Sequence, residues 1–283
     1  MKEIQIITSA HEMKNFAAEC KAQHKTIGFV PTMGALHIGH ISLINSSVKN
    51  CDVTVVSIYV NPTQFNNPDD LKKYPRTFDT DKAMLETTAC DVIFFPSINE
   101  MYPDGLITTQ LDLQGLDKVM EGEHRPGHFA GVVTIVKSLF EIVNPDVAFF
   151  GEKDFQQLAI IKYMTHAFNM PVEIMPCHTV REEDGLAFSS RNIHLTPDER
   201  KDAPLIYDTI SQCRNKKLTM TVYEVKAWAT NRINSSPYLK VEYIEFVNSK
   251  TLQPLNNWDE CEEQRVCTAV TVSKTRLIDN TVL

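Results

Sequence analysis

Two histidines lie three residues apart in the segment 33–40, where an apolar run gives way to a helical pattern. At that spacing His37 and His40 share one face of the first helical turn. Gly34 and Gly39 leave the backbone accessible to a bulky ligand. We expect unpaired N–H groups and the helix dipole to favour an anion here, and imidazoles add hydrogen-bond donors near neutral pH. The pattern indicates a site for a nucleotide triphosphate whose α-phosphate is attacked.

Two other roles for the histidine pair stay open on local sequence alone. A histidine at a helix start is often a cap or a surface residue, and a pair at this spacing is sometimes a zinc site. The segment lacks the glutamate of an H-E-x-x-H motif and contains no cysteine or carboxylate. The local sequence therefore favours phosphate chemistry over a structural role, and a structural role over zinc.

Strand and helix patterns alternate around the histidine segment, which indicates right-handed βαβ units and a parallel sheet. Three polar segments, 31–40, 61–65 and 151–157, directly follow predicted strands. We expect all three at the carboxyl edge of the sheet, where such folds bind ligands. The predicted strands cover residues 26–30, 53–60, 91–96, 146–150 and 172–176, and the predicted helices cover 10–22, 41–49, 78–88, 130–143 and 155–168.

The pattern changes after residue 176. A capping box at 196–199 predicts a helix that continues to about Cys213, a second helix follows at 222–233, and strands follow at 240–247 and 265–272. We therefore predict an α/β fold. Residues 1–176 form a Rossmann-like parallel sheet with helices on both faces, which binds the nucleotide and the acid substrate. Residues 177–283 form a smaller α+β domain that acts as a lid.

Composition excludes several classes of protein. The 283 residues are 43% hydrophobic and 23% charged, as in an ordinary soluble globular protein, and no apolar run is long enough to span a membrane. A formal net charge of -8 argues against broad binding to nucleic acid or to an anionic membrane. The N-terminus lacks a signal-peptide core, and the seven scattered cysteines include no C-x-x-C pair. We expect a cytoplasmic protein with reduced thiols and no structural zinc.

Polar residues after the predicted strands offer further binding groups. Lys153 is a point charge suited to a phosphate, although its neighbour Asp154 also fits a helix cap with Gln157 as partner. Gln64 offers a donor and an acceptor to a substrate that bears a hydroxyl and a carboxylate, unless 61–65 is an ordinary surface turn. Arg125, in the polar stretch 121–129, is either a phosphate clamp or part of a solvated loop.

The segment 188–191 places two hydroxyls and a guanidinium in succession near the predicted domain junction. These groups can hydrogen-bond phosphate oxygens and neutralise their charge. The plain alternative is a turn with a surface arginine. The position at a junction favours a closing lid.

These motifs together resemble a known family. The segment 31–40 resembles the HxGH signature of nucleotidyltransferases related to class I aminoacyl-tRNA synthetases, and 188–191 resembles their KMSKS-type loop. In this order the motifs identify the chain as a member of the pantothenate synthetases (pantoate–β-alanine ligases), closely over about residues 20–200. The further segments that carry this resemblance are 61–65, 74–77, 125–131, 151–157 and 181–192.

The resemblance implies a two-step, ATP-dependent ligation in pantothenate and coenzyme A biosynthesis. The carboxylate of pantoate attacks the α-phosphate of ATP to give pantoyl adenylate and pyrophosphate. The amine of β-alanine then displaces AMP to form pantothenate. The resemblance also implies magnesium with the triphosphate and a homodimer.

The resemblance carries roles to individual residues. His40 matches the proton donor, and the other catalytic positions are His37, Lys153, Ser189, Ser190 and Arg191. Gln64 and Gln157 hold pantoate, and Gln64 also borders the β-alanine site. Asp81 is a plausible metal-associated carboxylate, but no metal ligand is assigned. Two positions depart from the family pattern. Phe188 stands where the family commonly has an aliphatic residue, and Glu183 stands where it commonly has alanine. The implied ATP site comprises Met33, Gly34, Ala35, Leu36, His37, Ile38, Gly39, His40, Gly151, Glu152, Lys153, Asp154, Val180, Phe188, Ser189, Ser190 and Arg191.

Two other functions fit parts of the pattern. A nucleotidyltransferase of the same fold, acting on a phosphate monoester, releases pyrophosphate but forms no amide. A nucleotide-sensing module without turnover has no need of a proton donor, so the paired histidines argue against it.

Overall fold

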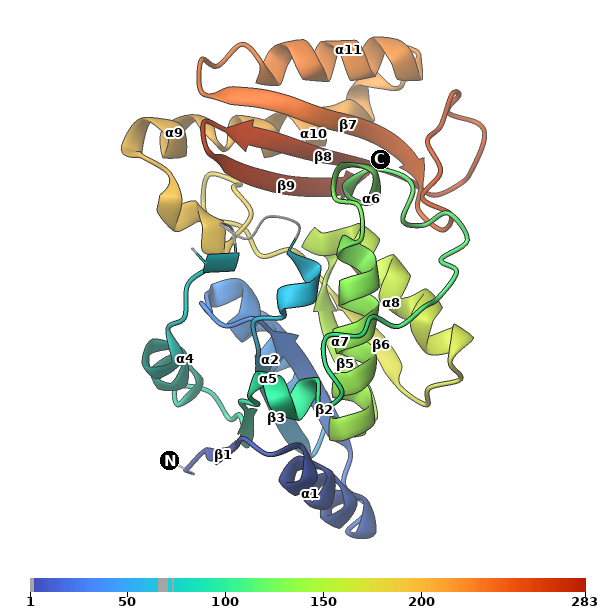
Figure 1. The fold of residues 1–283 in the computed structure, drawn as a ribbon. Coiled ribbons are helices and arrows are strands. Elements are labelled where there is room, and N and C mark those ends of the chain that lie inside the picture. Colours follow the sequence, from blue (N-terminus) through green and yellow to red (C-terminus); the bar gives the residue numbers. More distant parts are fainter. Residues whose placement is uncertain (1–2, 66–70, 73) are drawn as a thin grey trace. The chain divides into compact units, whose positions relative to one another are not determined.

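The computed structural model describes residues 3–65, 71–72 and 74–283 (Figure 1). The chain forms two compact units. The first unit contains Met1–Leu113, Arg125–Glu152 and Gln157–His178, and the second contains Gln114–His124, Lys153–Gln156 and Thr179–Leu283.

The first unit is built on a six-stranded sheet in which every neighbouring pair is parallel. The predicted Rossmann-like parallel sheet is thereby confirmed. The two central strands, β2 (Ile27–Thr32) and β3 (Val53–Ile58), pair in register from Ile27↔Val53 to Thr32↔Ile58. In sheet order the strands are β1 (Gln5–Ile7), β4 (Val92–Phe94), β3, β2, β5 (Val147–Gly151) and β6 (Glu173–Cys177).

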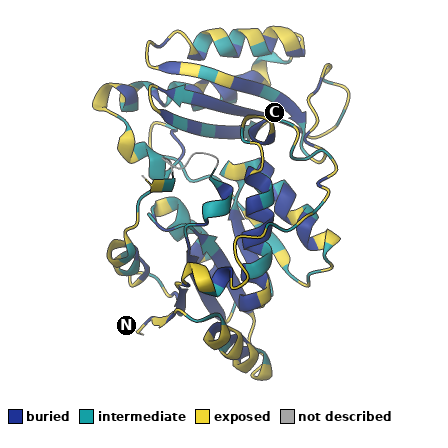
Figure 2. Cartoon of the chain, in the orientation of Figure 1, coloured by how far each residue is buried: buried dark blue, intermediate teal, exposed yellow. Residues whose placement is uncertain are grey.

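Helices cover both faces of this sheet. One face packs against α2 (Ile38–Asn50), and the other packs against α7 (His128–Val143). Every residue of β3 is buried, which is the burial expected of a strand covered on both sides (Figure 2). Further helices in the described part of the first unit are α1 (Ala10–Ala22), the 3-10 turn η1 (Pro62–Gln64), α4 (Phe78–Leu85), α5 (Ile98–Met101) and most of α8 (Phe155–Ala167).

The strand order reverses between β2 and β5. From β2 the chain moves to β3 and then β4 on one side, whereas β5 lies on the other side of β2 and leads to β6. Open parallel sheets bind ligands at such a switch point, beyond the carboxyl ends of the strands. The histidine turn follows β2, and the 3-10 turn η2 (Glu152–Asp154) and helix α8 (Phe155–Ala167) follow β5. The fold thus places the histidine turn and the start of segment 151–157 at the switch point.

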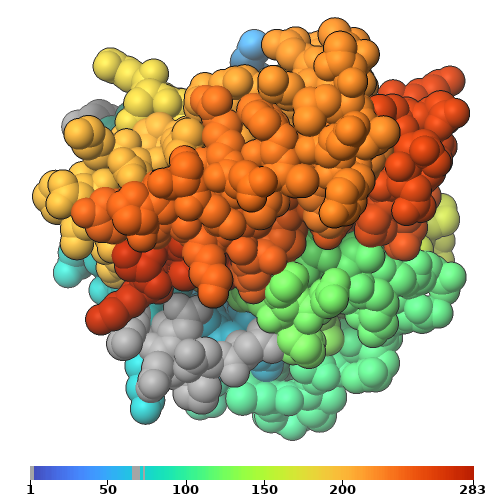
Figure 3. Space-filling model, turned by 90° about the horizontal axis from the view of Figure 1, so that it is seen from above, coloured from blue at the N-terminus to red at the C-terminus, as the bar shows by residue number. Residues whose placement is uncertain are grey.

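The second unit has a three-stranded antiparallel sheet of β7 (Leu239–Asn248), β8 (Gln264–Val272) and β9 (Thr275–Val282). Helices α10 (Leu205–Lys216) and α11 (Val222–Ile233) pack against it around an apolar core that includes Ile210, Phe246 and Val270. Figure 3 views this unit from the side of α11, whose segment of the chain is orange. The predicted smaller α+β domain is confirmed as a fold.

Buried charges of the small sheet are paired with segments drawn from elsewhere in the chain. Glu121, in the short helix α6 (Glu121–His124), is 7% exposed and makes a two-bond ion pair with Arg276 of β9. Arg181 makes another such pair with Asp279. Because an unpaired buried charge is costly, the Glu121–Arg276 pair explains why residues 114–124 pack with the second unit.

The structure corrects some predicted elements. The single helix predicted from 196 to about Cys213 is wrong, because it is divided into α9 (Pro197–Asp202) and α10. Pro204 lies at the break, where it cannot donate a helical N–H bond. Strands β1 and β9 were not predicted. All seven cysteines are free. Among the described residues, no helix has the length and apolar character that crossing a membrane requires.

Candidate functional site

The turn between β2 and α2 has two successive residues in the left-handed region. The φ angles are 81° at Gly34 and 49° at Ala35. A side chain at position 34 would be crowded on two sides, because its Cβ would lie 2.9 Å from Asp81 Oδ2 and 3.1 Å from Ile58 Cγ2. The turn therefore requires glycine at this position and brings the chain sharply into the helix that carries the histidines.

The two histidines form a reciprocal capping box at the start of α2. His37 is the N-cap, and its Nδ1 accepts a hydrogen bond from the Gly39 N–H at 3.1 Å. His40 Nδ1 accepts from the His37 N–H at 3.3 Å. The ring centroids lie 4.1 Å apart at an interplanar angle of 38°. The prediction that the two rings share one face is confirmed. Both histidines also have the capping role that the sequence left open, and this role does not exclude phosphate binding.

This cap determines the tautomer of both neutral rings. A neutral imidazole carries one proton, and a nitrogen that accepts a hydrogen bond is the one without it. Since Nδ1 accepts in both His37 and His40, the proton is on Nε2 in each. Each ring therefore presents an N–H donor at Nε2, without needing a positive charge.

The expectation of unpaired backbone N–H groups is wrong for five groups of the turn, those of residues 34–37 and 39. The Gly34 N–H donates to Thr32 Oγ1, and those of Ala35 and Leu36 donate to the Asp81 carboxylate. The His37 and Gly39 N–H groups are engaged in the capping box, as described above. These intramolecular acceptors satisfy the groups that a phosphate would otherwise bind, so the imidazoles are the main donors that the turn offers to an anion.

Gln64 lies at the end of η1, after β3, and is 9% exposed. The alternative of a surface turn is therefore wrong. Its Nε2 donates to Met33 Sδ at 2.7 Å, and its Oε1 accepts from Asn61 Nδ2 at 3.3 Å. Asn61 also donates to the Gly131 carbonyl at 3.1 Å. The predicted proximity of segments 31–40 and 61–65 is thereby confirmed within the first unit.

The backbone of α7 approaches this turn closely. A Cβ on Gly131 would collide with the Thr63 carbonyl oxygen, so only glycine allows the approach. Tyr102 donates from its hydroxyl to Asn61 Oδ1 at 2.6 Å, and burial raises the pKa of its phenol, which keeps it a donor at neutral pH. The Asn61 and Gln64 side chains are thus fixed before any ligand arrives.

The stretch 121–129 is buried at its two ends and exposed at 123, 124, 126 and 127, so the alternative of a solvated loop holds only for its middle. Glu121 and His128 are buried. Within the first unit, His128 Nδ1 contacts the Gln64 carbonyl at 2.8 Å, and Arg125 Nη1 lies 3.2 Å from His128 Nε2. The Arg125 guanidinium therefore lies one side chain away from the backbone of the Gln64 turn.

The KMSKS-like segment lies in the second unit, after a short hairpin. Phe188 donates its N–H to the Val180 carbonyl at 3.1 Å, which brings these two predicted residues together. Ser189 caps the 3-10 turn η3 (Ser190–His194) by accepting from the Arg191 N–H at 3.2 Å. The hairpin is held by Arg200, which binds both Glu182 and Asp184 at 2.6 Å and keeps the pKa of the Asp184 carboxyl below its usual value.

The GEKD segment is divided between the units. Gly151 and Glu152 belong to the first unit, and Glu152 Oε2 lies 3.0 Å from His178 Nδ1. Lys153 packs with the second unit, where its carbonyl accepts from Asn280 Nδ2 at 2.8 Å and its Nζ lies 3.9 Å from Asp154. Gln157 is half-buried in the first turn of α8.

The side chains around the turn do not form a preassembled metal site. No group of three or more His, Cys, Asp or Glu side chains in the described part of the chain is placed to hold a metal. Both oxygens of Asp81, the carboxylate that the sequence suggested, accept backbone N–H groups. The geometry therefore does not fit a protein-held magnesium at Asp81.

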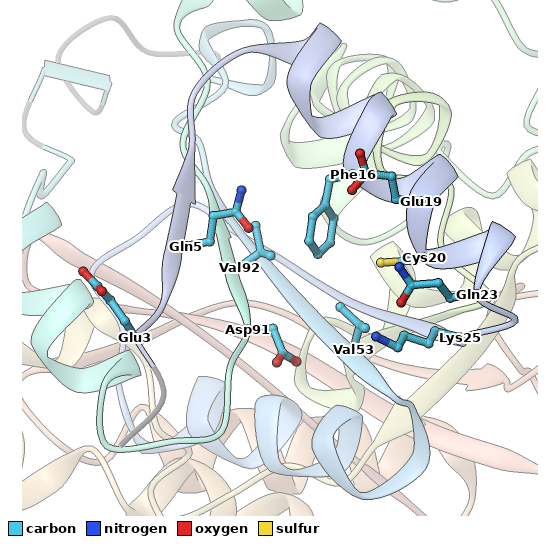
Figure 4. A pocket seen from close by; sticks show the side chains of 10 residues that line it. All are labelled: Glu3, Gln5, Phe16, Glu19, Cys20, Gln23, Lys25, Val53, Asp91 and Val92. Carbon is cyan, nitrogen blue, oxygen red and sulfur yellow. The ribbon is translucent and has the colours of Figure 1, made fainter.

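A pocket at the opposite edge of the parallel sheet is distinct from this site. It has a volume of about 210 Å³ and contains none of the predicted site residues. Figure 4 shows the Phe16 ring from α1 above the starts of β3 and β4, with Val53 and Asp91 beside it. Because the functional edge of such a sheet is the carboxyl one, this pocket plays no part in the proposed chemistry.

Three residues that shape the site have roles that the sequence did not predict. Asn61 and Tyr102 fix the Gln64 turn, and Asp81 fixes the histidine turn. Asp81 carried a readable signal, because Phe78, Asp81 and Leu85 share one face of α4 and a charge among apolar residues needs a buried partner. Tyr102 carried none, since its contact lies 41 positions away.

Comparisons with known proteins agree on one family. The family model for pantoate-beta-alanine ligase matches residues 5–282. The chain is 48% identical over 277 residues to the pantothenate synthetase of Porphyromonas gingivalis, in an alignment that covers 98% of each chain. It is 49% identical over 273 residues to that of Bacteroides fragilis, in an alignment that covers 95% of this chain and 96% of the relative.

Solved structures give the same result. Pantothenate synthetase from Thermus thermophilus superposes with a TM-score of 0.89 and 37% identity, covering 98% of this chain and 99% of that one. Pantoate-beta-alanine ligase from Francisella tularensis, complexed with beta-gamma ATP and beta-alanine, superposes with a TM-score of 0.83 and 38% identity, covering 99% and 98%.

Proposed function

This chain belongs to the pantoate-beta-alanine ligase family, and from that premise we propose that it joins pantoate to β-alanine in two steps at the His37–His40 turn. In the first step a pantoate carboxylate oxygen bonds to the α-phosphorus of ATP while the bond to pyrophosphate breaks. In the second step the β-alanine amine bonds to the activated carbonyl carbon, AMP leaves, and the amine loses a proton.

The chemistry explains why ATP is consumed. A carboxylate is a poor acylating agent, and adenylation turns its oxygen into part of a good leaving group. The protein has to orient the two reactants and stabilise the negative charge that develops on the phosphates. Donors that are already oriented serve this purpose best, because no reorganisation is needed as the charge develops.

The observation that carries the proposal is the capping box. It uses Nδ1 of both His37 and His40, which leaves Nε2 of each ring as its N–H donor, and the ring centroids lie 4.1 Å apart. We assign these two donors to the triphosphate, with His40 as the proton donor. Residues 33–40 line the nucleotide, as do Gly151 and Glu152 at the neighbouring strand end.

Gln64 and Gln157 are assigned to pantoate. Gln64 lies against Met33 and is held by Asn61, so its amide sits next to the nucleotide segment. The bound ligands of the Francisella relative, beta-gamma ATP and beta-alanine, support the same substrates here. Arg125 is a second cation for this region, since it contacts His128 beside the Gln64 turn.

The resemblance assigns further ATP-binding residues that belong to the second unit. Lys153 and Asp154 bind the nucleotide, with the Lys153 ammonium on a phosphate, and Val180 and residues 188–191 bind it as well. Ser189, Ser190 and Arg191 supply two hydroxyls and a guanidinium. Magnesium is implied by the family, and the oxygens of the triphosphate would be its main ligands if it binds, with no step of the proposed reaction assigned to it.

The assembly and location are part of the same proposal. We infer a homodimer in the cytoplasm, on the strength of the family. Light scattering on the purified protein tests the dimer: a mass of about twice 32.1 kDa supports it, and the monomer mass contradicts it.

The test of the function is AMP formation from ATP with each substrate omitted in turn. With pantoate and β-alanine present, AMP and pantothenate form in equal amounts. With pantoate alone, pyrophosphate release stops at about one equivalent per active site. AMP formation without pantoate, or sustained pyrophosphate release with no amide product, contradicts the proposal and favours a different nucleotidyltransferase. No turnover with any combination favours a nucleotide-sensing module.

A further inference from the structure

The Asp81 carboxylate is an internal anion inside the proposed nucleotide site. It is 1% exposed and belongs to α4, 45 residues along the chain from Leu36 in the turn that it contacts. We propose that Asp81 is a positioning residue for adenylation, which acts by holding the turn at residues 34–36 in the conformation that aims the two histidines. This inference rests on the proposed function.

The contacts join the carboxylate to the turn at two successive N–H groups. Asp81 Oδ2 accepts from Ala35 N–H at 3.0 Å, and Oδ1 accepts from Leu36 N–H at 2.8 Å. Thr77 donates from its hydroxyl to Oδ2 at 3.2 Å, which orients the carboxylate from the start of its own helix. A carboxylate is the side chain whose two oxygens can accept from two parallel donors at once.

The turn needs this support, because its backbone is not the conformation that its sequence prefers. Ala35 has a φ of 49°, in a region that costs free energy for a residue with a Cβ. Left-handed residues persist where the surrounding structure over-determines them, and they concentrate at ligand sites. The two charge-assisted bonds from Asp81 supply that constraint at the strained residue and at the next one.

The constraint passes directly to the histidines. Leu36, whose N–H is held by Asp81, precedes the N-cap His37, whose N–H is in turn held by His40. A shift of the turn therefore moves the helix start and both Nε2 donors together. Small displacements of groups that act on a transition state are costly to rate even where binding survives.

The carboxylate also keeps the turn's own N–H groups from competing for phosphate. With Asp81 in place, the Ala35 and Leu36 N–H groups are satisfied by an internal anion. Without it, two adjacent donors at a glycine turn form a backbone anion site of the kind seen in phosphate-binding loops. Asp81 thus directs the triphosphate to the imidazoles.

The test compares Asp81→Asn with Asp79→Asn, a control two residues earlier on the same helix, at an exposed position. The amide introduced by Asp81→Asn has one acceptor oxygen, and its NH₂ group faces a backbone donor. Two rates are measured in the full-length protein: pyrophosphate release from ATP and pantoate, and aminolysis of isolated pantoyl adenylate by β-alanine.

The positioning role predicts a loss confined to the first step. In Asp81→Asn we expect kcat for pyrophosphate release to fall by about tenfold or more, with KM for pantoate and the aminolysis rate within about twofold of wild type. Asp79→Asn leaves both rates unchanged. An unchanged adenylation rate in Asp81→Asn overturns the proposal, and so does an equal loss in both steps, because a purely structural role would lower both. If the wild type itself forms no AMP, the result contradicts the proposed function and leaves no rate by which to judge Asp81.

Two further variants keep the test decisive if Asp81→Asn does not fold. Thr77→Val removes one bond to Oδ2 and should give a smaller loss in the same step. Gly34→Ala places a Cβ 2.9 Å from Oδ2 and should also lower adenylation selectively. Selective losses in both support the proposal, and wild-type adenylation in both overturns it.

Discussion

His37 has two separable functions in this structure, and substitution can test each one alone. Its Nδ1 caps α2 through the Gly39 N–H at 3.1 Å, and its Nε2 carries the proton proposed to face the phosphates. Asparagine keeps an acceptor at the δ position but has no ε donor. Glutamine keeps an ε donor but has no δ acceptor, and alanine has neither. Three variants of one position therefore distinguish capping from phosphate binding.

The magnitudes follow from the bonds that each variant loses. Loss of an N-cap acceptor costs about 1 kcal/mol, within a range of about 0.5–2. In a domain of this size that lowers Tm by about 2–4 °C. Loss of an oriented donor to a developing anion lowers the rate by about 10²–10³-fold, equivalent to about 2.7–4 kcal/mol. His37→Asn should therefore keep the wild-type Tm and lose adenylation. His37→Ala should lower both the Tm and the adenylation rate. His37→Gln should lower the Tm but keep a higher adenylation rate than His37→Asn.

The assays are thermal unfolding without ligands and single-turnover pyrophosphate release with ATP and pantoate. A His37→Asn variant that releases pyrophosphate at the wild-type rate contradicts the donor assignment. A His37→Asn variant that unfolds as early as His37→Ala contradicts the capping geometry, and with it the assigned Nε2–H tautomer. Circular dichroism at low temperature confirms that all variants start folded.

Four further predictions test the remaining parts of the structure. His40→Ala should slow adenylate formation by at least about 10²-fold, and near-normal single-turnover kinetics would refute its role as proton donor. Gln64→Ala should raise KM for pantoate far more than KM for ATP, whereas equal increases would count against the pocket assignment. Arg276→Leu leaves the Glu121 carboxylate buried without its two-bond partner and should cost about 3–5 kcal/mol in urea unfolding; a loss below about 1 kcal/mol would contradict the burial of that pair. Burial raises the pKa of the Cys213 thiol from 9.0 to about 12, so its contribution to stability is complete below pH 9 and is lost as pH rises to about 12. Between those limits the unfolded thiol ionises and the folded one does not. Wild-type stability should then fall about 1.4 kcal/mol per pH unit more steeply than that of Cys213→Ala, and parallel curves would refute the shift.

Local patterns predicted most of the fold, because the decisive interactions there are local. The run of β-branched residues predicted strand β3, and the spacing of apolar residues predicted helix α7. Asn144 ends α7 in the left-handed conformation, with φ of 47°. Pro204 is a local signal for a helix break, and the helix predicted from 196 to about Cys213 wrongly continued through it. Strand β1 has three residues and could not be recognised without its partner β4. Strand β9 carries Arg276 and Asp279, charges that are tolerated there because Glu121 and Arg181 pair with them.

The sequence predicted where the candidate site lies, but it did not predict which hydrogen bonds hold its backbone. Spacing alone brought His37 and His40 to one face, and strand order brought their turn to the switch point. Which acceptor satisfies each backbone N–H depends on Asp81, which is 45 residues from Leu36 and is placed by the packing of α4. No pattern confined to residues 31–40 contains that information. The expectation of unpaired N–H groups failed for this reason, and it failed in a chemically informative way.

The occupied backbone changes what this turn can do to a phosphate. In a glycine-rich phosphate loop the N–H groups themselves bind the anion, and they cannot give up a proton. Here Asp81 and the capping box use those groups internally, so the imidazoles provide the donors. A neutral imidazole that accepts at Nδ1 still donates from Nε2, and unlike a backbone amide it can pass that proton on. A reaction that releases pyrophosphate benefits from such donors, because charge develops on the leaving oxygen as its bond breaks. The structural role of the histidines as caps is therefore what makes them suitable donors: the bond that fixes the helix start also places the proton on Nε2.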